Sequence, residues 1–416
     1  IQVYITRDDI CPGENKDLYN TVFKRLLDIG DFVGIKGFVF KTQTGEISVH
    51  AKELVLLSKS LKPLPIVKYK DGVAYDKFDD PELRYRQRYV DLIVNPDSRR
   101  NFEIRSKLVS YLRAFLDGRG YMEVETPVLN TISGGATARP FITHHNTLDL
   151  DMYMRIATEL HLKRLIVGGL ERVYEIGRIF RNEGMDTKHN PEFTTVELYE
   201  AYADFNDMMD LFEDFLSGAA MEILGTYDVS WQGENISLAP GFRRLTMAEA
   251  VKEYLGVDFM TMSGDEEAVV AAKSVGVDMD GVEPTWGHAL YECFDQRVEE
   301  KLIQPTFITM HPVDVSPLAK RSPKDHRLTE RFELFICRSE MGNAFSELND
   351  PIDQKERFQK QVEMRAKGDE EAGMMDDDYI NALEYGLPPT GGLGIGIDRC
   401  VMLLTGADSI RAVILF

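Results

Sequence analysis

Apolar and polar residues alternate along short runs at the start of the chain. The runs IQVYI, DFVGIKGFVF, EISVH and ELVLLSK, all within residues 1–60, have the two-residue period of β-strands. A helix is predicted between the first two runs, over 17–30, because apolar residues recur there at helical spacing. The pattern therefore predicts a small β-rich module.

A change in composition marks the start of a second domain. Two prolines and several charges in KPLPIVKYKDG indicate a linker, so we predict domains over 1–62 and 85–416 joined by 63–84. From Asn101 a long amphipathic helix is predicted, ending at Gly118, followed by the strand YMEVET and Pro127. This unit suits either ordinary core packing or a dimer interface.

The range 205–290 is rich in helical patterns and carries no chemical motif, so we predict a helix-rich insertion there. No internal repeat is present.

Charged and aromatic residues are interleaved in two neighbouring strand patterns, RVYEIGRIFRNE and PEFTTVELYEAY, which predict an antiparallel hairpin around the polar loop GMDTKHNP. Side chains alternate between the faces of a strand. One face therefore carries Glu175, Arg181 and Glu183 on the first strand, and Phe193, Glu197 and Tyr199 on the second. That face either lines a cleft or forms cross-strand ion pairs on a solvated sheet.

A second cluster lies in ERFELFICRSEMGNAFSELND, residues 330–350. Glu333 and Glu340 flank a predicted strand turn and could hold Mg²⁺ together with phosphate oxygens. An ordinary surface pair is the alternative. Beyond the turn, Asn343, Phe345 and Glu347 share one face.

Two more segments place charges at helix starts. PPTGGLGIGIDRCVMLLTG, residues 388–406, predicts a glycine-rich strand and then a helix from Asp398 to Gly406, with Arg399 able to bind phosphate. Its glycine spacing does not fit a dinucleotide-binding loop. Upstream, Thr158 is predicted to cap a helix that ends at Gly168 and carries Glu159 in its first turn.

Composition bounds the class of protein. The net charge is −21, but residues 1–70 hold 11 basic and 8 acidic residues, a balance of +3, which leaves −24 for the rest. A mildly basic module on an acidic body can offer nucleic acid one docking surface. No apolar run approaches the length of a membrane span, no signal peptide is recognised, and the four cysteines are scattered, so a soluble protein of a reducing cytoplasm is expected.

These segments together resemble a known family. FRNEG…HNPEFT…E at 180–197 is similar to motif 2 of class II aminoacyl-tRNA synthetases, GLGIGIDR to motif 3, and GYMEVETPVL to motif 1. The further segments RYRQRYVDL, GGATARPFITHHN, ELHLKRLIVGG, HPVDVSPLAK and GNAFSELNDP resemble the lysyl-tRNA synthetases, in the group that includes the aspartyl and asparaginyl enzymes.

The resemblance implies an α+β fold: an antiparallel catalytic sheet flanked by helices, preceded by an OB-fold barrel that reads the anticodon. It implies lysine, ATP and tRNA(Lys) as substrates, Mg²⁺ as cofactor, and a homodimer built through motif 1. The family's barrel begins several strands before IQVYI, so we expect residues 1–62 to form a partial barrel and do not predict which residues read the anticodon.

The resemblance also assigns the site residues. It gives the catalytic role to Arg181 and Arg399 and the metal to Glu333 and Glu340. The ATP site that it implies comprises Arg181, Glu183, His189, Asn190, Phe193, Glu333 and Arg399, with Phe193 stacked on adenine opposite Arg399. The lysine site that it implies comprises Gly135, Glu159, Arg181, Glu197, Tyr199, Asn343, Phe345 and Glu347.

The residue chemistry agrees with a dicationic amino acid, because buried carboxylates need partners and lysine carries an ammonium group at each end. Two alternatives stay open. A paralogue that attaches lysine to a protein would share the catalytic residues but usually lacks the barrel. A binding protein with a dead site would lack one of Arg181, Glu333, Glu340 or Arg399, all of which are present.

Overall fold

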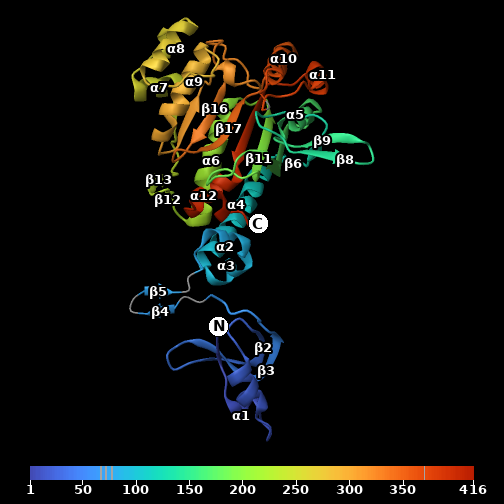
Figure 1. Cartoon of the computed structure of the whole chain (residues 1–416), viewed down its shortest axis with the longest axis vertical. Coiled ribbons are helices and arrows are strands. Elements are labelled where there is room, and N and C mark those ends of the chain that lie inside the picture. The colour runs from blue at the N-terminus through green and yellow to red at the C-terminus, as the bar shows by residue number, and fades with distance from the viewer. Residues whose placement is uncertain (66–67, 71–72, 76–77, 370) are drawn as a thin grey trace. The chain divides into compact units, whose positions relative to one another are not determined.

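A computed structural model describes residues 1–416 except 66–67, 71–72, 76–77 and 370. The chain divides into two compact units, one of Ile1–Ser98 with Phe416 and one of Arg99–Leu415 (Figure 1). The predicted linker, 63–84, falls within the first unit, and part of it lies outside the described residues. The domain boundaries stay a prediction.

The N-terminal unit is built on a three-stranded sheet in the order β1-β3-β2. The runs EISVH and ELVLLSK, predicted as two strands, form one strand, because no turn residue separates them and both pair with β2. Its core is small and includes Ile10, Cys11, Ala51 and Leu54, as suits part of an OB-fold barrel. Its elements are β1 (Gln2–Tyr4), α1 (Arg7–Ile10), the π-helical η1 (Leu18–Leu26), β2 (Phe32–Lys41), β3 (Ile47–Ser58), β4 (Lys68–Lys70), β5 (Val73–Tyr75), α2 (Pro81–Arg86) and α3 (Arg88–Val94).

The larger unit contains an eight-stranded sheet in the order β14-β15-β16-β17-β18-β11-β10-β6. Its central pairs are antiparallel, and the two edge pairs, β14 with β15 and β10 with β6, are parallel. The predicted α+β class is confirmed. The strands are β6 (Met122–Glu123), β10 (Arg172–Phe180), β11 (Glu192–Ala201), β14 (Arg243–Thr246), β15 (Thr306–Thr309), β16 (Arg331–Phe335), β17 (Glu340–Ser346) and β18 (Thr390–Gly396).

Helices pack on the sheet in three hydrophobic clusters. The largest cluster joins the sheet to α4 (Pro96–Asp117), α6 (Phe205–Leu224) and α12 (Ile397–Thr405). A second contains α5 (Glu159–Val167), α10 (Pro351–Ala366) and α11 (Asp377–Tyr385). The third contains α7 (Met247–Leu255), α8 (Asp265–Ser274) and α9 (Trp286–Arg297).

Shorter elements complete this unit: β7 (Leu129–Asn130), β8 (Ile142–His145), β9 (Leu150–Met154), β12 (Asp228–Trp231), β13 (Glu234–Ser237), η2 (Phe259–Thr261), η3 (Glu299–Lys301), η4 (Val313–Val315) and η5 (Ile410–Ala412).

Two of the predicted boundaries that differ from the structure lie at prolines. The long helix begins at Pro96 rather than at Asn101, because the fixed φ of proline suits a first helical turn. The strand predicted over YMEVET shrinks to Met122–Glu123, since Pro127 lacks the N–H that a ladder needs.

The range 205–290, predicted as one helix-rich insertion, divides between two cores. Helix α6 carries Phe212, Phe215 and Leu216 into the main core, and β14 joins the large sheet as its edge strand. Only α7 to α9 form a separate cluster. Helical periodicity alone cannot tell which core an apolar face will join.

Candidate active site

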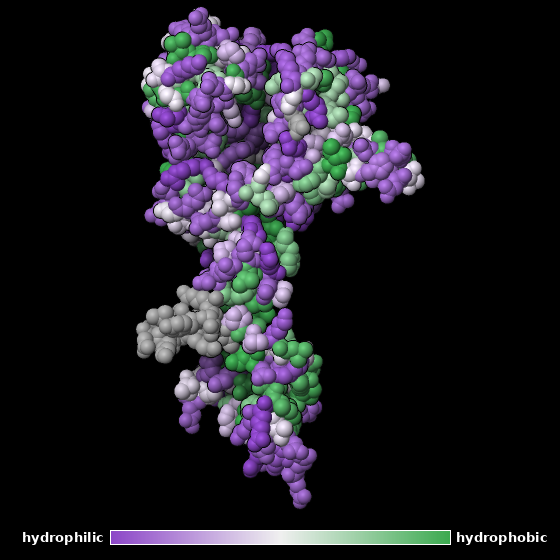
Figure 2. All heavy atoms as spheres, in the orientation of Figure 1, coloured by the Kyte–Doolittle hydropathy of each residue, from purple (hydrophilic) through white to green (hydrophobic). Residues whose placement is uncertain are grey.

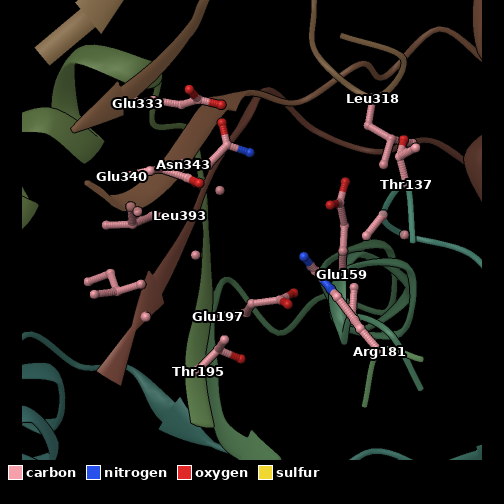
Figure 3. A pocket seen from close by; sticks show the side chains of 18 of the residues that line it. Thr137, Glu159, Arg181, Thr195, Glu197, Leu318, Glu333, Glu340, Asn343 and Leu393 are labelled. Carbon is pink, nitrogen blue, oxygen red and sulfur yellow. The ribbon is translucent and has the colours of Figure 1, made fainter. Parts of the chain in front are cut away.

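The large sheet forms the floor of a cavity of about 480 Å³. Figure 2 shows the surface hollowed between the lobe of α7 to α9 and the lobe of α10 and α11. The walls come from β11, β16, β17, β18, α5 and the segments 181–190 and 315–319. In Figure 3, Glu333 and Glu340 lie on one side of this cavity, Glu159 and Arg181 lie on the other, and Glu197 lies between them.

The predicted hairpin of β10 and β11 has one polar face and one apolar face. Val196 and Leu198 are fully buried in the main core, while Phe193, Glu197 and Tyr199 line the cavity. The cleft interpretation of the second strand is therefore correct. Glu175 lies opposite Glu197 in the register but is absent from the cavity wall. It forms a buried ion pair with Arg155, which lies outside the hairpin, so neither interpretation describes this residue.

The loop after β10 carries several of the predicted nucleotide-binding residues. Arg181 starts it, its backbone N–H donating to Pro191 O at 2.8 Å, and its guanidinium lies 5.3 Å from the Phe193 ring centroid. The buried Arg181 Nε has no hydrogen-bond partner among the described residues. A buried, unpaired cationic donor at a cavity wall suits an anionic ligand.

His189 and Asn190 are also held by local contacts. His189 lies between Asp186 Oδ2, 2.8 Å from its Nδ1, and Arg399 Nη2, 3.2 Å from its Nε2. Asn190 Nδ2 donates to Glu192 O at 2.7 Å. Both residues line the cavity, as does the exposed Glu183.

The predicted glycine-rich strand and helix are present as β18 and α12. Arg399, in the first turn of α12, donates to Glu340 O at 2.6 Å. The guanidinium of Arg181 lies over the ring of Phe193. The stacking of adenine on Phe193 opposite Arg399 stays a prediction.

A network behind these arginines joins three elements. Arg105 of α4 forms an ion pair with Asp398 and donates to Thr194 Oγ1 at 3.0 Å. Asp398 Oδ2 accepts from the backbone N–H of Thr194 at 2.7 Å. The residues beside Arg399 and Phe193 are thus fixed to each other and to α4.

The two predicted metal ligands lie on paired strands. Glu333 of β16 accepts a hydrogen bond from Arg331 at 2.6 Å, and Glu340 opens β17. Burial and the neighbouring Glu333 raise the pKa of Glu340, and they outweigh Arg399, whose Nη1 lies 3.5 Å from Glu340 Oε2. Within the described part of the chain, no three His, Cys, Asp or Glu side chains gather as a metal site. Two carboxylates suit a cation such as Mg²⁺ whose other ligands are phosphate oxygens or water.

The other end of the cavity is buried and rich in carboxylates. Glu159 is 8% exposed and Glu347 is 1% exposed. The remaining predicted residues of this end, which also line the cavity, are Gly135, Glu197, Tyr199, Asn343 and Phe345. Burial and the nearby Glu159 raise the pKa of Glu197 to about 7.

One predicted contact at this end is wrong. Thr158 precedes α5, but its hydroxyl makes no capping bond, and Thr158 Oγ1 is buried without a hydrogen-bond partner in the described structure. Its helical φ and ψ of −103° and −6° place the residue outside the extended conformation of a capping residue. The backbone N–H of Thr158 donates instead to Glu197 Oε1 at 3.2 Å.

Two cations at the site were absent from the sequence prediction. Lys163 is fully buried, with Nζ 2.5 Å from Glu159 Oε1 and in an ion pair with Glu347. Arg331 donates to Asn343 Oδ1 at 2.9 Å as well as to Glu333. The only signal for Lys163 was its position one helical turn after Glu159. Nothing in the local pattern pointed to Arg331.

Among the described residues, no helix combines the length and the apolar character needed to cross a membrane.

Comparison with known proteins gives a consistent result. Residues 80–416 match the model of the family described as tRNA synthetases class II (D, K and N). The whole chain aligns with the lysine–tRNA ligase of Pelotomaculum thermopropionicum at 57% identity, and the alignment covers 80% of that protein. The lysine–tRNA ligases of Staphylococcus aureus and Listeria monocytogenes are 56% and 57% identical to the chain, which covers 81% of the length of each.

Proposed function

The chain belongs to the class II tRNA synthetases, within the lysine–tRNA ligases, and on this basis we propose how its cavity performs the reaction. The protein activates L-lysine with ATP to lysyl-adenylate and transfers the lysyl group to the 3′ end of tRNA(Lys). The observation that carries the assignment of the site is the buried end of the cavity, where Glu347 Oε1 has no hydrogen-bond partner among the described residues.

Lysine binds at this carboxylate-rich end. Its ε-ammonium contacts Glu347 and Tyr199, beside Asn343 and Phe345, and its α-ammonium contacts Glu159 near Gly135. Glu197 also faces the lysine side chain and its ε-ammonium and adds a third carboxylate. A neutral isostere of lysine would leave these carboxylates uncompensated in a buried site, which is costly.

ATP binds at the open end. Phe193 stacks on the adenine, and Glu183, His189 and Asn190 contact the nucleotide from the loop. Arg181 and Arg399 contact the phosphates. The support for this placement is the buried and unpaired Arg181 Nε together with the contact of Arg399 with His189.

In the first step the lysine carboxylate attacks the α-phosphorus of ATP in line, and pyrophosphate leaves. Arg181 and Arg399 offset the negative charge that develops on the phosphoryl oxygens. Bound Mg²⁺, held by Glu333 and Glu340, would neutralise phosphate charge as a Lewis acid. In the second step a ribose hydroxyl of the terminal tRNA adenosine attacks the adenylate carbonyl and AMP leaves. Positioning supplies most of the acceleration, and no enzyme nucleophile takes part.

The N-terminal unit is proposed to contact the anticodon. Its sheet carries a cluster of the rings of Tyr4, Phe38, Phe40 and His50, with Lys52 Nζ 6.0 Å from the Phe38 ring centroid. Phe38 is 51% exposed. Exposed rings beside a cation suit stacking with unpaired bases.

A homodimer through α4 and the segment 120–129 is also proposed. The exposed apolar side chains of Met122, Val128 and Leu129 support it, because burial against a second copy of the chain would remove their apolar surface from water. A cytoplasmic location accompanies the proposed role in protein synthesis.

The test of the site is lysine-dependent exchange of pyrophosphate into ATP by the full chain, followed by charging of tRNA. We expect exchange with lysine and none with aspartate or asparagine. Exchange that depends on aspartate instead would overturn the assignment of the pocket.

A further inference from the structure

The lysine end of the cavity already contains a lysine of the chain itself. Lys163 of α5 contacts two of the pocket carboxylates, Glu159 and Glu347, and is itself fully buried. Its Nζ also lies 5.4 Å from the Phe345 ring centroid and 6.0 Å from that of Tyr379. Its charge is therefore held by contacts from α5, β17, α11 and the residue after β17.

We propose that Lys163 is a positioning residue for substrate selection: a fixed counter-ion that sets the charge of the pocket to match an amino acid with two ammonium groups. The inference rests on the lysine-binding function proposed above. It assigns to Lys163 a role through Glu159 and Glu347, without contact with the substrate.

The charges at this end support the match. Glu159, Glu197 and Glu347 are three carboxylates, and Lys163 compensates one of them. Two remain for the two ammonium groups of lysine. Arg331 and Arg181 are the other cations that act on these carboxylates. The guanidinium of Arg331 is already held by Glu333 and Asn343, and Arg181 is assigned above to the phosphates of ATP.

The two carboxylate oxygens of Glu347 have different surroundings. Oε2 meets Lys163 as an ion pair outside hydrogen-bond geometry, and Oε1 has no donor in the described structure. Oε1 lies against Gly392, at the cavity wall. An unpaired buried oxygen is costly, so an incoming ammonium group gains the full benefit of pairing with it.

The protonation of the pocket depends on Lys163. Burial opposes a charge on Lys163, but Glu159 and Glu347 outweigh burial and raise its pKa, so the side chain stays cationic. Burial raises the pKa of Glu347, and Lys163 is the largest opposing influence. Tyr199 and Tyr379, which face the same group, stay neutral because burial raises their pKa.

Without the charge of Lys163, the pocket carboxylates should bind a proton at neutral pH. The lysine substrate must then displace this proton in order to bind. In Lys163→Met we expect KM for lysine to rise about tenfold at pH 7 and to approach the wild-type value by pH 9, a shift of about one pH unit. Lys163→Arg, which keeps the charge, should retain the wild-type pH profile. KM for ATP should stay constant in both variants.

The measurement is pyrophosphate exchange by the full chain from pH 6 to pH 9. Calorimetry in buffers of different ionisation enthalpy counts the protons that lysine releases on binding. We expect about one additional proton from Lys163→Met at pH 7. If Lys163→Met raises KM equally at every pH and releases no additional proton, Lys163 only fills space and the proposal is wrong.

Melting curves check that the variants fold. If Lys163→Met does not fold, Lys163→Met combined with Glu159→Gln keeps the net charge of the pocket and should return the pH midpoint of lysine binding to the wild-type value. If the pH midpoint of lysine binding in this double variant still differs from the wild-type value by one pH unit, the proposal is also wrong. Failure of the proposed function itself is distinct, because the wild-type chain would then show no lysine-dependent exchange.

Discussion

The two ends of the cavity differ in burial. At the nucleotide end His189 keeps 53% of its side chain exposed and Glu183 is exposed, and both lie on the loop that follows β10. At the lysine end Glu347 is 1% exposed and follows directly on a central strand. Charges at the open end are screened by water and can rearrange as ATP enters and pyrophosphate leaves. Charges at the buried end are fixed, so a wrong ligand there leaves a charge uncompensated.

The largest expected effect comes from the open end, where the chemistry takes place. Arg181→Ala should reduce pyrophosphate exchange by about 10³-fold, because it removes a cation that faces the developing phosphoryl charge. The melting temperature should change little, since Arg181 Nε makes no hydrogen bond within the part of the chain that the structure describes. Arg178→Ala is the matched control: Arg178 lies on the same hairpin, 42% exposed, in a long ion pair with Glu192. Near-normal exchange in Arg181→Ala would remove this residue from the mechanism.

Next in size is the removal of one buried charge. Glu347→Gln should raise KM for lysine by about 100-fold, as expected for one partner of a buried charge pair. KM for ATP should be unaffected, because Glu347 lies at the far end. Glu192→Gln, at an exposed carboxylate, serves as control. Equal losses for lysine and ATP would show that the two ends are not independent.

Substrate analogues sharpen the same comparison without mutation. Norleucine has the length of lysine without the ε-ammonium and should give no measurable exchange, because Glu347 would be left unpaired. Ornithine is one methylene shorter and keeps both charges. It should be disfavoured by only about 1 to 3 kcal/mol in kcat/KM. Ornithine excluded as completely as norleucine would mean that shape, and not charge, governs the buried end.

The smallest effect is a pH dependence confined to the buried end. With its pKa raised to about 7, Glu197 is protonated below that pH and loses its attraction for an ammonium group. KM for lysine should therefore rise about tenfold between pH 8 and pH 6, while KM for ATP follows a different profile. Glu197→Gln should flatten the lysine profile. A wild-type KM for lysine that is constant over this range would contradict the assignment.

Much of the site follows from local periodicity, because the residues concerned lie on strands whose two faces differ. Phe193, Glu197 and Tyr199 alternate with Val196 and Leu198, and the structure places the two sets on opposite sides of β11. The same logic holds for Asn343, Phe345 and Glu347 on and after β17. Which ligand each residue binds was predicted from the resemblance to a family and not from periodicity.

Other features depend on contacts between distant segments. Glu175 has the same strand phase as the cavity residues, but Arg155 covers it. Lys163 has the pattern of a surface helix residue, and its burial follows from the arrival of Glu347 and Tyr379 from segments far along the chain. Helix α6 and strand β14 carry no local mark that distinguishes them from the elements of the separate α7 to α9 cluster.

Gly392 has a bearing on inhibitor resistance. A methyl group at this position would overlap Glu347 Oε1 and lie 2.5 Å from Tyr199 Cε1. Resistance to a compound that competes with lysine and lies against Gly392 could arise by replacing this glycine with a larger residue, whose side chain would occupy the space of the compound. Here that change would displace the carboxylate that the substrate itself needs, so escape and loss of charging would come with the same substitution.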